Sequence, residues 1–167
     1  MSRFHELLRN TPPATLGVIS LCCVLYLVQV ITDLPLHDLT MCPRLIIFEG
    51  EVYRVVTSAL FHASLMHIGM NAMSLSAIGG MLEKRMGTLR ILCTMLLSIF
   101  VTSVIYIAAA LFLDMVFGRK GLMNQHSLGF SGVIFHVSVL ECNIGTHGSR
   151  SVFGLFDVTS SLYPWVL

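Results

Sequence analysis

The tetrapeptide Gly129-Phe130-Ser131-Gly132 opens an apolar stretch, residues 133–140, and this combination decides the fold class that the sequence predicts. A serine between small residues lets neighbouring backbone approach its hydroxyl closely, as at the sharp turns that carry acyl-transfer nucleophiles in soluble enzymes. The residues that follow are suited to a membrane. We therefore expect this serine to lie inside a bilayer.

The composition supports a membrane protein. The 167 residues are 55% hydrophobic and only 11% charged, with a mean hydropathy of +0.82, whereas soluble domains carry about a quarter charged residues. The net charge of +1 is spread without a long basic run, which argues against nucleic-acid binding. The five cysteines form no CxxC motif and no Cys/His metal spacing, so we expect neither a metal nor a cofactor.

Four stretches have the length or composition of membrane spans. They are residues 14–32, about 60–82, 91–113 and about 128–144, the last being shorter and interrupted by Glu141. A polar loop, residues 145–161, precedes residues 163–167, which resemble the interfacial start of a fifth span. The sequence thus predicts an all-α polytopic membrane bundle, with four complete transmembrane helices and the start of a fifth. We expect residues 1–167 to form a single, incomplete domain.

The distribution of lysine and arginine predicts the orientation of the spans. With a cytosolic N-terminus, six basic residues lie on the cytosolic side and four on the other, which favours this topology. The second and fourth spans then both enter from the non-cytosolic face. His67 and Ser131 would consequently lie in the same outer half of the membrane.

Two polar residues in the second span could join Ser131 in one site. His67 and Asn71 are four residues apart and share a helix face. Polar side chains at membrane depth are costly, and by default they are candidates for function. An imidazole N–H, an Asn amide and the backbone N–H of Ser131 could stabilise an oxyanion. These residues together suggest peptide-bond hydrolysis inside the bilayer. In the alternative interpretation, His67 and Asn71 form interhelical hydrogen bonds and GxSG is a packing motif.

The same helix carries a second ladder of small residues, Ala72, Ser76 and Gly80. Small residues at this spacing allow another helix to approach closely. We therefore expect the second span to be a central helix that is surrounded by protein.

Three ordered motifs resemble the rhomboid family of intramembrane serine proteases. They are His62-Ala-Ser-Leu-Met-His67-Ile-Gly-Met-Asn71, Gly79-Gly80-Met-Leu-Glu83-Lys84-Arg85-Met-Gly87 and Gly129-Phe-Ser131-Gly132. Phe153-Gly154-Leu155-Phe156 and Tyr163-Pro164-Trp165 are similar to a eukaryotic branch of rhomboids that carries a ubiquitin-associated domain further downstream.

The resemblance implies a six-helix bundle with a water-filled cavity open to the non-cytosolic side. It implies Ser131 as the nucleophile, and it assigns oxyanion contacts to His67, Asn71 and backbone near Ser131. His62 matches a further position near the cavity. Glu83 and Arg85 match structural positions beside the long first loop, residues 33–59, and Gly129 and Gly132 flank the nucleophile.

The resemblance also implies a general-base histidine in a sixth helix, which these 167 residues do not contain. His136, five residues after Ser131, would lie about 140° around the helix from it. His5, His37, His126 and His147 are expected outside the bundle. Because a serine without a base is a poor nucleophile, we expect this chain to be a C-terminally truncated and inactive rhomboid-like endopeptidase.

The alternative is a non-catalytic rhomboid-like protein that binds transmembrane clients. In either case the expected partners are the lipid bilayer and membrane-anchored proteins, as substrates or as clients. The chain would be a multi-pass membrane protein, and family resemblance favours the endomembrane system, the endoplasmic reticulum or Golgi.

Overall fold

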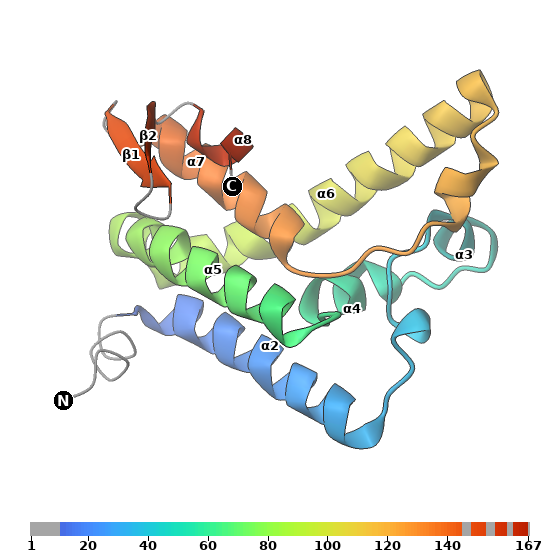
Figure 1. The fold of residues 1–167 in the computed structure, drawn as a ribbon, viewed down its shortest axis with the longest axis horizontal. Coiled ribbons are helices and arrows are strands. Elements are labelled where there is room, and N and C mark those ends of the chain that lie inside the picture. Colours follow the sequence, from blue (N-terminus) through green and yellow to red (C-terminus); the bar gives the residue numbers. More distant parts are fainter. Residues whose placement is uncertain (1–10, 145–147, 153–155, 160–161, 167) are drawn as a thin grey trace.

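The computed structural model describes residues 11–144, 148–152, 156–159 and 162–166. Most of these residues are helical, which confirms the all-α class. Figure 1 shows the helices drawn in blue, green and orange side by side, and the long helix drawn in yellow crossing them at an angle. The helices are α2 (Pro13–Thr32), α3 (Pro43–Phe48), α4 (Arg54–Leu60), α5 (Leu65–Met86), α6 (Thr88–Phe117), α7 (Ser131–Ile144) and α8 (Tyr163–Val166), with 3₁₀ turns at Leu36–Asp38 and Lys120–Asn124.

Three of the described helices, α2, α5 and α6, are long and apolar enough to cross a membrane. They correspond to the first three predicted spans. The fourth, α7, has 14 residues and begins at Ser131, three residues later than predicted. Residues 128–130 precede it in non-helical backbone, and Gly129 there has a φ of 111°.

The predicted start of the second span was wrong. The sequence pattern placed residues 60–64 inside one helix, but the chain makes a break there between α4 and α5. Ser64 is the N-cap of α5, and its hydroxyl accepts a hydrogen bond from the His67 N–H at 3.2 Å. His62 consequently lies in an extended linker before the helix.

Helix α5 has three helical neighbours, but it is not surrounded by protein as predicted, since Met66 and Met73 on it are 77% and 70% exposed. It packs against α2, α6 and α7, and in Figure 1 it lies between α2 and α7. Its small residues face the start of α2: a Cβ at Gly79 would lie 3.3 Å from the Thr15 hydroxyl, and one at Gly80 would lie 3.5 Å from the Pro12 ring. Close helix approach through small side chains is therefore confirmed.

Glu83 ties the end of α5 to the beginning of α2. Its carboxylate accepts hydrogen bonds from the Ala14 and Thr15 N–H groups at 2.9 and 2.8 Å, and from the Thr15 and Thr88 hydroxyls at 2.8 and 2.9 Å. Helix α2 begins with prolines and has no side-chain cap of its own. Glu83, only 3% exposed, supplies that cap from another helix.

The apolar core lies where α5, α6 and α7 meet. Its most buried members come from all three helices, so the short α7 packs against both of its longer neighbours through apolar side chains. These members are Ile78, Leu82, Ile91, Val133 and Val137.

A small antiparallel ribbon lies beyond the bundle, in a segment that the sequence predicted as a polar loop. Strands β1 (Ser149–Val152) and β2 (Phe156–Thr159) pair with Val152 opposite Phe156 and Ser149 opposite Thr159. Valine, phenylalanine and threonine favour strands, which accounts for the difference. The first part of the predicted eukaryotic motif, residues 153–155, lies outside the described residues.

Candidate active site

The segment that leads into α7 is held in place from one side by the long first loop. Met41 and Ser127 form an antiparallel bridge with N–H to O=C distances of 2.8 and 3.0 Å. The Gly129 N–H donates to the Ser58 carbonyl of α4 at 2.7 Å. These backbone hydrogen bonds fix the position at which the chain turns into the helix, and hence the position of Ser131.

Gly129 is needed at this turn for two separate reasons. Its φ of 111° lies in a region that side-chain-bearing residues rarely adopt. A Cβ there would also lie 2.5 and 2.6 Å from the Cε1 and Nε2 atoms of His67. The imidazole of α5 therefore packs directly against the backbone two residues before Ser131.

Ser131 is the first residue of α7, so its backbone N–H is one of those at the N-terminus of the helix. The first N–H groups of a helix have no acceptor in the preceding turn, and they lie at its positive end. The first helical bond of α7 runs from the Ile134 N–H to the Phe130 carbonyl. The Ser131 N–H is thus available to a negatively charged group beside the hydroxyl of the same residue.

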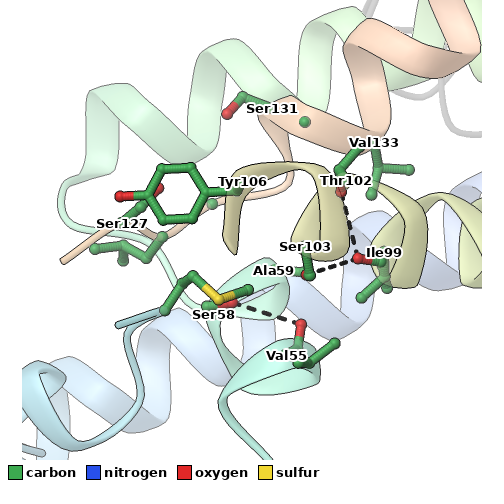
Figure 2. Close-up of a pocket in the computed structure, with 14 residues that line it drawn as sticks. Val55, Ser58, Ala59, Ile99, Thr102, Ser103, Tyr106, Ser127, Ser131 and Val133 are labelled. Atoms are coloured by element: carbon green, nitrogen blue, oxygen red, sulfur yellow. Dashed lines mark hydrogen bonds between the residues drawn. The ribbon is translucent and has the colours of Figure 1, made fainter. Parts of the chain in front are cut away.

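Two cavities meet at Ser131. The first, about 210 Å³, lies between α4, α6 and the segment before α7, and Figure 2 shows the side chains around it. Several hydroxyls line it, and two of them donate back into α6: Thr102 to the Ser98 carbonyl at 2.7 Å and Ser103 to the Ile99 carbonyl at 2.7 Å. The cavity wall thus carries uncharged hydroxyls among apolar side chains. The hydroxyl-bearing residues are Ser58, Thr102, Ser103, Tyr106, Ser127 and Ser131.

The second cavity, about 510 Å³, runs between α5 and α7. Asn71 and Ser74 line its α5 side, and Ser131 and Ser138 line its α7 side. The two helices thus present polar groups to one common space. Asn71 and Ser131, which the sequence placed in separate spans at matching depth, border the same cavity.

Asn71 is joined to His62 by a hydrogen bond of 2.9 Å between Nδ2 and Nε2. His62 is fully buried, and its ring lies edge-on to that of His67 with 5.1 Å between centroids. His62 thus contacts both His67 and Asn71, and His67 packs against Gly129, whereas Ser131 is linked to this group through the cavity that it shares with Asn71. Gly132 borders both cavities and faces Thr102 of α6.

Glu83 and Arg85 lie elsewhere, and their expected place beside the long first loop was wrong. Helix α5 runs antiparallel to α2, so its C-terminal end reaches the start of α2 and not the loop that follows α2 (Figure 1). Arg85 lies 4.0 Å from Glu141 of α7, a carboxylate that is 1% exposed. These residues hold helices together at the end of the bundle away from Ser131.

Gln29 is a member of the site's surroundings that the sequence did not single out. It is buried in α2, and its amide donates to the His62 carbonyl at 3.0 Å. A polar side chain in an otherwise apolar span was the available signal, because such groups need a partner in a membrane.

Three of the described histidines, His37, His62 and His126, have partners other than the Ser131 hydroxyl. His126 shares a 2.6 Å hydrogen bond with Thr40, and its ring lies against that of His37 with 4.2 Å between centroids. In the part of the chain that the structure describes, no hydrogen bond joins the Ser131 hydroxyl to an imidazole. His5 and His147 lie outside the described residues. Nor do the described segments hold a group of three or more His, Cys, Asp or Glu side chains placed to bind a metal ion.

Comparisons with known proteins find a family and several relatives. The rhomboid domain pattern matches residues 49–167. Rhomboid-like protein 15 of Arabidopsis thaliana is 36% identical over 159 residues, which cover 93% of this chain and 40% of that protein. Rhomboid protease GlpG of Serratia proteamaculans is 33% identical over 135 residues, 80% of this chain and 44% of that protein. GlpG of Yersinia pestis is 31% identical over the same length. This chain thus spans less than half the length of these relatives.

Proposed function

The chain belongs to the rhomboid family, and from that premise we propose that it forms the nucleophile-bearing and oxyanion-binding part of an intramembrane serine endopeptidase. Its substrates would be membrane-anchored proteins, cut near the ends of their transmembrane helices. The observation that supports the proposal is that Asn71 of α5 borders the same cavity as Ser131, and the His67 imidazole packs against Gly129, two residues before Ser131.

In the proposed reaction the Ser131 Oγ attacks the scissile carbonyl carbon. The Ser131 proton passes to a base, the carbonyl oxygen becomes an oxyanion, and collapse expels the amine, which takes up a proton. Water then hydrolyses the acyl-enzyme. The Asn71 amide, the His67 imidazole and the Ser131 N–H would stabilise the oxyanion.

Among the described residues, no histidine is hydrogen-bonded to Ser131 as a base would be. His62 has both ring nitrogens within hydrogen-bond distance of other groups, and His126 is bonded to Thr40. His136 follows Ser131 by five residues, about 140° around α7. We therefore propose that the 167 residues alone do not hydrolyse peptide bonds, because losing a member of a catalytic unit costs orders of magnitude in rate.

The same proposal covers location and subgroup. We propose a multi-pass protein of the endomembrane system, related to the eukaryotic rhomboids that carry a ubiquitin-associated domain. The plant relative supports only the eukaryotic part of this proposal, since its match covers more of this chain than the bacterial matches do.

The test measures cleavage of a transmembrane reporter in proteoliposomes. The chain alone should not cut it, whereas the chain fused to the last two helices of a rhomboid protease should. Ser131→Ala should abolish cleavage by the fused chain, and Asn71→Ala should slow it by about a hundredfold to a thousandfold. A fused chain that binds the reporter but never cuts it would support a client-binding function instead. Cleavage by the chain alone, lost in Ser131→Ala, would mean that one of its own histidines is the base.

A further inference from the structure

The buried imidazole of His62 connects three parts of the bundle. It lies in the linker between α4 and α5, and its Nδ1 is 3.1 Å from the Leu60 carbonyl oxygen. Its Nε2 is 2.9 Å from the Asn71 amide nitrogen. Its own backbone carbonyl accepts from Gln29 of α2 at 3.0 Å. With no solvent exposure, this side chain has few other arrangements open to it.

These contacts specify where the imidazole carries its hydrogen. A carbonyl oxygen can only accept, so the nitrogen facing Leu60, Nδ1, must be the donor. In a neutral imidazole the other nitrogen, Nε2, is then an acceptor only. Asn71 has to present its NH₂ group to Nε2, because an amide oxygen there would meet a lone pair.

This orientation matters for Ser131. The Asn71 NH₂ group has two hydrogens, and His62 takes one. The same nitrogen lies 3.5 Å from the position a Cβ would have on Gly129, beside the cavity that Asn71 shares with Ser131. A reversed amide would place a partly negative oxygen where an oxyanion is to be stabilised.

We propose that His62 is a positioning residue: it fixes the Asn71 amide with its NH₂ group toward the Ser131 cavity. The inference rests on the proposed function, since the orientation has a use only if Asn71 serves an oxyanion. Gln29 contributes by holding the backbone of His62 against α2. His62 itself does not touch the reacting atoms.

Two substitutions separate the two nitrogens of the ring. In His62→Gln the side-chain oxygen can reach the place of Nε2 and accept from Asn71. In His62→Asn the shorter amide can reach only the place of Nδ1, so it keeps the bond to Leu60 and loses the acceptor for Asn71. Both variants remove the imidazole, and each keeps one of its two side-chain contacts, so the pair distinguishes the contact with Asn71 from the contact with Leu60.

The first measurement is NMR of the ¹⁵N-labelled chain in lipid nanodiscs above pH 8. We expect His62 as the neutral tautomer with hydrogen on Nδ1, and an Asn71 amide signal that shifts in His62→Asn and much less in His62→Gln. A His62 tautomer with hydrogen on Nε2, or an Asn71 amide signal that shifts in neither variant, would overturn the proposal whether or not the chain is catalytically active.

The second measurement is the rate at which a fluorophosphonate labels Ser131 in the chain fused to two helices that bring a base histidine. In His62→Asn the labelling rate of Ser131 should fall by about tenfold or more, a smaller loss than removal of an oxyanion donor causes. In His62→Gln most of the labelling rate should remain. Equal rates in the two variants would overturn the proposal. Labelling no faster than in Ser131→Ala would instead count against the proposed function, and the NMR result would still decide the link between His62 and Asn71.

Discussion

Replacing Glu83 by glutamine tests the most connected polar contact of the bundle. The carboxylate accepts four hydrogen bonds, two at each oxygen: Ala14 N–H and the Thr88 hydroxyl at Oε1, and the Thr15 N–H and hydroxyl at Oε2. Glutamine retains one oxygen and places an NH₂ group against the donors at the other. The negative charge at the start of α2 is also lost.

The magnitude follows from these contacts. A hydrogen bond to a charged acceptor contributes about 1.5–3 kcal/mol, and one of the two backbone N–H groups, that of Ala14 or that of Thr15, loses its acceptor in Glu83→Gln. Adding the lost charge–dipole attraction of about 0.3–1 kcal/mol, we expect a loss of about 2–4 kcal/mol in the free energy of unfolding. Thr88→Val, which removes one of the four bonds, should cost about 1 kcal/mol.

Unfolding of the purified chain in mixed micelles, followed by circular dichroism, measures both losses. Glu83→Gln should unfold at clearly lower denaturant than Thr88→Val, and both at lower denaturant than wild type. A Glu83→Gln variant within about 0.5 kcal/mol of wild type would refute the view that this carboxylate caps α2 from another helix.

Three further predictions concern other parts of the molecule. Gly129→Ala should cost about 1–3 kcal/mol in backbone strain alone and displace His67, so the Ser131 labelling rate should fall even where the variant remains folded by circular dichroism. Burial, and the positive charges of His37 and Arg54, lower the pKa of His126 below its ordinary 6.5. Because the folded state binds this proton less readily than the unfolded state, the stability that neutral His126 contributes should be fully present above pH 6.5 and be lost as the pH falls through the pKa of the folded state. His126→Asn should flatten this pH dependence in thermal unfolding scans. A glycosylation acceptor inserted between Lys84 and Thr88 should stay unmodified in microsomes, because this turn is predicted to be cytosolic; its modification would reverse the topology.

The main helices could be predicted from the sequence because length and charge-free composition suffice for membrane spans. Their ends could not, because local signals set them. Helix α5 starts at the cap Ser64 and not where the apolar run begins. Helix α6 continues through Asp114 to Phe117, beyond the end of the predicted span at residue 113. It ends at Gly118, whose φ of 63° lies outside the helical region.

The candidate site was predictable where spacing alone carries the information. His67 and Asn71 share a face of α5 by their separation of four residues, and the small residues around Ser131 indicate close approach. The bond from His62 to Asn71 and the contact of Gln29 with His62 depend on how α2 and the linker pack, which no local pattern encodes. Glu83 was misplaced for the same reason, since its partners are 68 and 69 residues away.

The central claim, that Ser131 is a nucleophile awaiting a base from outside the described residues, is tested most directly by its reactivity at neutral pH. The measurement is intact-mass analysis after exposure to a fluorophosphonate, comparing the chain alone with the chain fused to two helices that bring a base histidine. The account predicts one adduct per molecule, on Ser131, in the fused chain and almost none in the chain alone. An unreactive Ser131 in a folded fused chain, or an adduct that survives Ser131→Ala, would contradict it.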